Sequence, residues 1–270
     1  MNAFRQDWAQ QLLDVLYENE YHAGFEEVCP FCDSSQLATY RCKDCFHGRP
    51  KCKNCMVGEH EKNPFHRVER WTGAYLEKLF MSDLGLIIYL GHSGERCCKA
   101  QAPVKTTIVH TNGIQVSQVL YCECNGPNDF GNCKASKAVQ LLHNGLYAAS
   151  FKRPQTAFSV AVFKQFHHMS MQSKVTAHDF YAGLRRYTNF GFHSDSKDRY
   201  REFMISERQY SFLRNLRWSH RRADESLSAG SLALECPACP QPDMNMDPNW
   251  RSCDKDLMCA HLPFVLRSWS

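Results

Sequence analysis

The chain has 270 residues and a mass of 31.2 kDa, which allows one large domain or two modest ones. Hydrophobic residues make up 43% and charged residues 22%, which is typical of globular proteins and argues against wholesale disorder. A formal net charge of +4 does not by itself indicate a nucleic-acid partner. No window is long and apolar enough for a membrane-spanning helix, so no membrane partner is expected.

The N-terminal segment, residues 1–27, predicts a helix. Phe4, Trp8, Leu12 and Leu16 recur at helical spacing and would form one apolar face. Acidic residues interrupt the segment, so it lacks the apolar core of a secretory signal. Without an export signal, the 15 cysteines of the chain are better explained by metal binding than by a disulfide scaffold.

Residues 28–70 predict a compact zinc module, because three Cys-x2-Cys pairs are followed by two histidines. Each pair places two thiolates on a tight turn and fills half of a tetrahedral site. In interleaved modules the first pair shares a metal with the third, and the second with the fourth. The first predicted site is Cys29, Cys32, Cys52 and Cys55, and the second is Cys42, Cys45, His60 and His66. His47 is an alternative histidine for the second site.

This module resembles the cross-braced B-box and ZZ zinc fingers, including the histidine-containing tail HEKNPFH. Four protein ligands per metal would close each site, so zinc would hold the fold and would not activate water. Five basic residues around the second and third pairs stand against the single acid Asp44, and such a patch could contact phosphates. The candidate DNA contacts here are Arg41, Lys43, Arg49, Lys51 and Lys53. A solvated surface loop is the alternative.

Beyond residue 70, a hairpin and helices are predicted. The β-branched runs TTIVHT and IQVSQVLY meet around Asn112-Gly113, which predicts a hairpin over residues 106–124 with a type I′ turn. Apolar residues return to helical spacing over residues 158–187, and a further long helix is expected over residues 198–218.

A third zinc site is predicted from two further cysteine pairs. Neither pair fills a site alone, but four thiolates brought together would do so. The predicted ligands are Cys122, Cys124, Cys236 and Cys239. We interpret the adjacent Cys97 and Cys98 as structural or incidental, and His92 as a polar residue without a partner.

The last predicted helix is basic, with seven arginines against two glutamates over residues 199–222. Arginine presents bidentate donors that suit phosphates and guanine edges. The candidate DNA contacts are Arg214, Arg217 and Arg221. The residues expected to form its apolar stripe are Phe203, Tyr210, Leu213 and Leu216. An ordinary amphipathic surface helix is the alternative.

Five blocks of the sequence appear in a characteristic order: the cluster beginning YRCKDC, then SDLGLIIYLGH, a hairpin ending YCEC, FKRPQTAFSVAVFKQFHHMSMQSKVTAHDFY, and GSLALECPACPQPDMNM. Over about residues 8–250 this order resembles the CxC2-like cysteine-cluster region of fungal KDZ (Kyakuja, Dileera and Zisupton) transposases. The resemblance implies a nuclear, DNA-contacting region that precedes a DDE-type catalytic core. Residues 251–270 depart from the family where that core would follow, so we expect a truncated transposase with no catalytic residue.

Together these patterns predict a mixed α+β fold: an N-terminal helix (1–27), a cross-braced two-zinc module (28–70), a hairpin and helical region (71–250) and a divergent tail (251–270). The expected function is non-catalytic DNA binding supported by two zinc ions, or three if the third site forms. A zinc-dependent protein-interaction module and a ubiquitin-ligase component are the alternatives. No phosphate-binding loop or GxSxG motif occurs, and no small-molecule substrate is expected.

Overall fold

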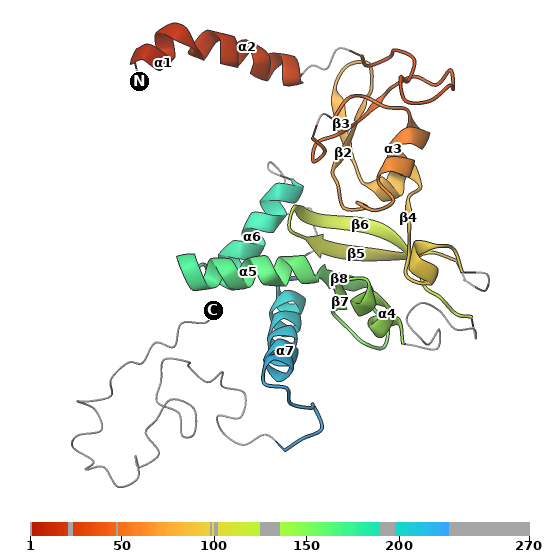
Figure 1. Ribbon diagram of the computed structural model, residues 1–270, viewed down its shortest axis with the longest axis vertical. Helices are drawn as coiled ribbons and strands as arrows, with labels where there is room; N and C mark the ends of the chain where they lie inside the picture. The colour runs from red at the N-terminus through yellow and green to blue at the C-terminus, as the bar shows by residue number, and fades with distance from the viewer. Residues whose placement is uncertain are drawn as a thin grey trace, which may run out of the picture. The chain divides into compact units, whose positions relative to one another are not determined.

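The computed structural model describes residues 2–20, 24–46, 48–97, 99, 102–124, 136–189 and 198–226. These residues form the predicted mixed α+β fold, with helices and two separate sheets (Figure 1). The chain divides into two compact units, residues 1–210 and 211–270. No described helix combines the length and apolar character that a membrane span requires.

Two helices, α1 (Asn2–Asp7) and α2 (Ala9–Glu20), occupy the predicted N-terminal helical segment. Their apolar face lies at the surface: Trp8 is 58% exposed, Leu12 48% and Leu16 61%. None of the residues of α2 is buried. This face therefore lacks the tertiary packing from which most helices in proteins draw their stability.

The first sheet contains three short antiparallel strands in the order β1-β2-β3. Both β1 (Tyr40–Cys42) and β3 (Leu76–Leu79) pair with the central strand β2 (Val68–Trp71). Helix α3 (Lys53–Glu59) contacts β1 and the 3-10 helix η1 (Met81–Leu84). Met56, Val68 and Met81 form the buried centre of this region, together with Cys42. The sheet continues to residue 79, beyond residue 70, where the predicted module ends.

The second sheet contains five strands in the order β4-β6-β5-β8-β7. The predicted hairpin is confirmed, because β5 (Val104–His110) and β6 (Gly113–Leu120) pair antiparallel. Strand β4 (Ile87–Tyr89) runs parallel to β6. Strand β8 (Thr156–Ser159) runs parallel to β5 and antiparallel to β7 (Leu146–Ala148). Because β4 and β6 are parallel, the residues that follow both strands emerge at the same edge of the sheet.

The turn of the hairpin differs from the predicted type I′ turn. His110 pairs with Gly113, so the two loop residues are Thr111 and Asn112. Neither has the positive φ that a type I′ turn requires. The Asn112 side chain instead donates to the carbonyl oxygen of Phe65 at 2.7 Å. The turn is therefore shaped by contact with the first sheet region and not by local propensity alone.

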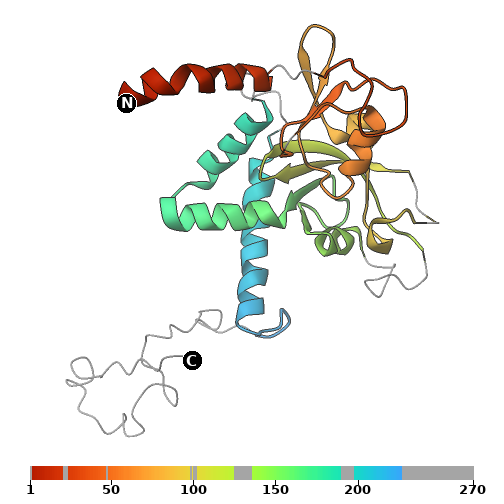
Figure 2. The same ribbon diagram turned by 45° about the horizontal axis from the view of Figure 1, so that its top comes forward.

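The predicted helix over residues 158–187 forms as two helices, α5 (Val160–Ser173) and α6 (Ala177–Thr188). Lys174 adopts a left-handed conformation after α5, and the Thr176 side chain accepts a hydrogen bond from Asp179 N to cap α6. Phe158 belongs to β8 and not to the helix. Helices α5 and α6 meet at an angle in both views (Figures 1 and 2). Helix α6 also packs against β6.

The predicted basic helix is confirmed as α7 (Tyr200–Trp218). Phe203 is fully buried and joins Phe158 and Phe163 in an aromatic core. The predicted apolar stripe is wrong at Leu213, which is 41% exposed. The boundary between the two compact units falls at residue 210, and Leu213 lies beyond it.

Candidate metal centres

The first cluster contains Cys29, Cys32, Cys52 and Cys55. These are the four residues that the sequence predicts for the first site, where the first and third Cys-x2-Cys pairs share a metal. Their sulfur atoms all lie within 4.8 Å of one another, and Cys32 Sγ is 3.7 Å from Cys52 Sγ. Cys52 caps the N-terminus of α3 and Cys55 lies in its first turn. Cys52 N also donates to Cys29 Sγ at 3.4 Å. The start of α3 thus orients the second half of this cluster toward the first.

The second cluster contains Cys42, Cys45, His60 and His66, again with all ligand atoms within 4.8 Å of one another. Cys45 Sγ lies 3.2 Å from His60 Nε2 and 3.4 Å from His66 Nδ1. His60 Nδ1 lies 2.8 Å from the Met56 carbonyl oxygen. Because a carbonyl oxygen only accepts, Nδ1 carries the proton and Nε2 keeps its lone pair for a metal. The alternative ligand, His47, lies outside the described residues.

A third cluster combines His92, Cys97, Cys122 and Cys124, whose ligand atoms also lie within 4.8 Å of one another. Cys122 Sγ is 3.3 Å from His92 Nε2 and 3.5 Å from each of the other two sulfurs. The interpretation of His92 as a residue without a partner is therefore wrong, and of the two interpretations of Cys97, structural or incidental, the cluster favours the structural one. The parallel strands β4 and β6 bring His92 and Cys122 together, because each follows one of these strands.

The predicted partners of Cys122 and Cys124 in the third site were Cys236 and Cys239, which lie outside the described residues. Within the described residues, His92 and Cys97 occupy the two remaining positions of a four-ligand set. A tetrahedral zinc site takes four protein ligands. The described residues alone therefore suffice for a complete third set.

Side chains of α4 (Lys137–His143) and of the residue that follows it make hydrogen bonds to the backbone around the third cluster. Gln140 Oε1 accepts from Cys122 N at 2.9 Å, and Gln140 Nε2 donates to Cys122 O at 3.0 Å. Asn144, which follows α4, donates from Nδ2 to Leu90 O at 3.0 Å. Gly91 lies so close that a Cβ there would come within 2.6 Å of Cys122 Cβ. These contacts fix the ends of β4 and β6, from which the ligands project.

The thiols in the clusters differ in acidity. A hydrogen bond with the Ser34 side chain lowers the pKa of Cys32 to about 6. Burial raises the pKa of Cys42 to about 12. Burial also opposes the ionisation of Cys97, but backbone hydrogen bonds and His92 together lower its pKa to about 6. A bound cation favours the thiolate form and would therefore oppose the effect of burial on Cys42.

The donor sets fit zinc. One cluster offers four sulfurs, one offers two sulfurs and two imidazoles, and one offers three sulfurs and an imidazole. Thiolate and imidazole are the ligands with which proteins bind zinc tetrahedrally. Four protein donors leave no coordination position for water or substrate, so an ion held by any of these sets would stabilise the fold.

Two of the predicted DNA contacts point away from solvent. Arg41 is 8% exposed, and its guanidinium donates to Glu69 Oε2 at 2.8 Å and to two backbone carbonyls at the end of α2. The Lys51 side chain is 12% exposed and pairs with Glu59. These two charges are largely neutralised inside the first sheet region and are poorly placed to reach a phosphate.

The other predicted DNA contacts are more accessible. Lys43 is exposed, although its ammonium lies 3.2 Å from Glu69 Oε1. Arg214 is half-buried, with its guanidinium 5.0 Å from the centre of the Trp218 ring. The remaining four side chains are exposed: Arg49, Lys53, Arg217 and Arg221. Arg221 lies 3.7 Å from Glu225.

One known protein family matches the part of the chain that contains the third cluster. Residues 81–190 match the family described as a CxC2-like cysteine cluster associated with KDZ transposases. The match covers β4, the hairpin and helices α4 to α6, whereas the first two clusters precede it. No curated protein and no solved structure matches the chain. The resemblance is thus confirmed for a shorter stretch than the sequence suggested: residues 81–190 are similar to the CxC2-like cysteine clusters associated with KDZ transposases.

Proposed function

We propose that this chain is a zinc-supported, non-catalytic DNA-binding region of a KDZ-like transposase that acts in the nucleus. The observation that carries the proposal is the CxC2 match, which contains the complete third cluster of four metal-binding side chains. The proposed metal is zinc, one ion per cluster, held by the twelve residues described above. Its role is structural, because each donor set is closed.

The proposed DNA contacts are the exposed basic side chains of the second compact unit and of the zinc clusters. Arg217 lies in the last turn of α7, Arg221 follows the end of the helix, and both side chains are exposed. Exposed guanidinium groups that lie close together in the sequence, one in the last turn of a helix and one just after it, can each reach a phosphate of the same duplex. Arg49 and Lys53 supply a second exposed pair in the first unit.

Exchanging both Arg217 and Arg221 for alanine should weaken the salt dependence of DNA binding. Each basic side chain that reaches a phosphate contributes about 0.9 to the slope of log K against log salt, so the double variant should lose about 2 units of slope. The measurement is the affinity for a short duplex between about 50 and 200 mM salt.

The matched control replaces the same two residues with lysine. Lysine keeps the charge, so the slope should remain close to that of the wild type even if affinity changes. An alanine double variant with the wild-type slope would contradict a role for α7 in DNA binding. Duplex binding that does not respond to salt at all would argue against phosphate contacts anywhere in the chain.

A second candidate function, protein interaction, is favoured by the N-terminal helices. Trp8, Leu16 and Tyr17 are each more than half exposed, and α2 has no buried residue. Large apolar side chains gathered on an exposed helical segment often mark a protein interface. Unlike phosphate contacts, binding through such a face should respond little to salt, which separates the two functions.

A further inference from the structure

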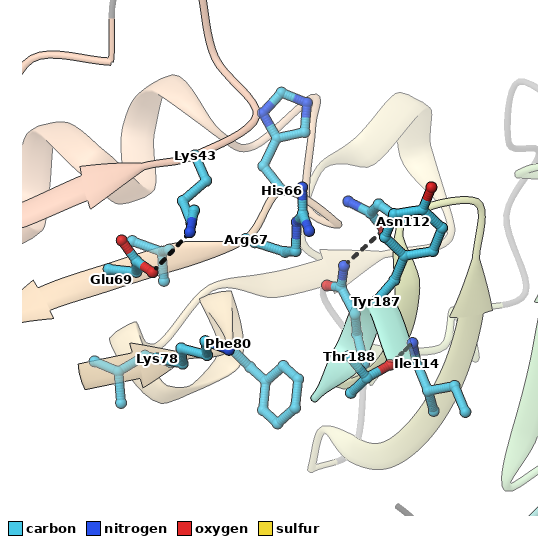
Figure 3. A pocket seen from close by; sticks show the side chains of 13 residues that line it. Lys43, His66, Arg67, Glu69, Lys78, Phe80, Asn112, Ile114, Tyr187 and Thr188 are labelled. Atoms are coloured by element: carbon cyan, nitrogen blue, oxygen red, sulfur yellow. Dashed lines mark hydrogen bonds and ion pairs between the residues drawn. The ribbon is translucent and has the colours of Figure 1, made fainter. Parts of the chain in front are cut away.

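A small cavity lies where the first sheet region meets the hairpin and the end of α6 (Figure 3). Its volume is about 120 Å³. Lys43 and Arg67 approach it from one side, and Ile114 and Tyr187 from the other (Figure 3). All of its lining residues belong to the first compact unit.

The lining of the cavity combines apolar, aromatic and charged side chains. Val68, Leu79 and Ile114 contribute aliphatic surface, and the rings of Phe80 and Tyr187 contribute aromatic surface. Its charged lining residues are three cations and one anion: Lys43, Arg67, Lys78 and Glu69. This balance favours a ligand that has an aromatic or apolar body and carries negative charge.

The cations differ in how far they are already neutralised. Lys43 lies 3.2 Å from Glu69, and the Arg67 guanidinium lies 2.5 Å from Asp44. No ion pair is found for Lys78 among the described residues, and its side chain is exposed. Lys78 is therefore the charge best placed to receive an anion at the cavity.

The volume limits what can enter. An apolar cavity of about 150 Å³ takes up benzene, so a cavity of this size holds roughly one six-membered ring. A nucleotide combines such a ring with an attached phosphate. Bases of unpaired nucleic acid bind by stacking on aromatic side chains while lysines and arginines track the backbone.

We propose that this cavity binds one unpaired nucleotide of DNA, with its base ring between Phe80 and Tyr187 and its phosphate at Lys78. The inference rests on the proposed function and deepens it, because it gives the chain a preference for DNA with an unpaired base over intact duplex. A base inside a duplex is stacked and cannot enter the cavity without being extruded, which costs a few kcal/mol.

The test compares single-stranded DNA, intact duplex and free deoxynucleotide, with 5-methylpyrimidin-2-one, a fluorescent base with a single six-membered ring, as the reporter. Wild-type protein should bind the single strand more tightly than the duplex and change the fluorescence of the reporter. Tyr187→Ala and Lys78→Ala should each weaken single-strand binding by about 10-fold, and leave duplex binding within about 2-fold. Phe80→Leu keeps an apolar side chain and should still abolish the fluorescence change.

Two controls match these variants in exposure. Tyr75 is 63% exposed against 62% for Tyr187, and does not line the cavity. Lys62 is exposed and likewise lies outside the lining. Tyr75→Ala and Lys62→Ala should therefore preserve the preference for single-stranded DNA and the fluorescence change.

Failure of the cavity proposal is distinguishable from failure of the proposed function. Salt-dependent duplex binding with no preference for the single strand would overturn the cavity proposal alone. Tight binding of free deoxynucleotide, with no gain from the DNA strand, would overturn DNA as the source of the ligand. Absence of binding to any DNA would overturn both proposals.

Discussion

Replacing Cys42 with serine is expected to remove one zinc ion per chain and to unfold the region that contains the first two clusters. Cys42 Sγ lies among the second set of ligands, and Cys42 also belongs to the buried core formed by Met56, Val68 and Met81. Structural zinc contributes about 10–16 kcal/mol to the folding of small zinc domains. Whole domains are stable by only about 5–15 kcal/mol, so the loss of one ion should not be tolerated.

The measurement is zinc content together with hydrogen exchange of the amides in β1, β2 and α3. We expect one ion fewer and loss of protection in all three elements. Cys98→Ser is the control for loss of a thiol, since none of the proposed ligand sets includes Cys98. Full zinc content and unchanged protection in Cys42→Ser would contradict the assignment of the second cluster.

Replacing Cys97 with serine is expected to remove a different zinc ion, the one held by the third cluster. Cys97 Sγ lies 3.5 Å from Cys122 Sγ, and Cys97 is 4% exposed. Loss of this ion should cost several kcal/mol and lower the melting temperature by about 10 °C or more. The first two clusters share no ligand with the third, so their ions should remain.

Cys236→Ser provides the decisive comparison, because the sequence alone pairs Cys236 with Cys122. The ligand set of His92, Cys97, Cys122 and Cys124 predicts that Cys97→Ser loses zinc and Cys236→Ser does not. The opposite pattern, with zinc lost only in Cys236→Ser, would restore the set predicted from the sequence. Zinc loss in Cys98→Ser in place of Cys97→Ser would show that the wrong cysteine of the adjacent pair has been assigned.

The sequence predicted the first two ligand sets because their spacing is local. Each Cys-x2-Cys pair defines its own turn, and the pairs and histidines follow one another within residues 29–66. The third set could not be found in this way, since His92 and Cys122 are brought together by the parallel pairing of β4 with β6. The apolar run before His92 and the strand before Cys122 were the available signals, but nothing local predicts their pairing.

Other differences between prediction and structure have both local and long-range causes. The helical pattern over residues 158–187 does not reveal the left-handed Lys174 that divides it into two helices. The positive charge of Arg41 is visible in the sequence, but its burial depends on Glu69, which lies 28 residues away. The burial of Arg41 thus depends on long-range pairing, whereas the break between α5 and α6 is local, with Lys174 left-handed and Thr176 capping α6.

The most direct test of this account is the zinc content of purified protein prepared without chelators. Elemental analysis, normalised to protein by amino-acid analysis, should give three zinc ions per chain. Each of the three clusters would then hold one ion, as its four-ligand donor set requires. A content of two or fewer would contradict the three-centre account.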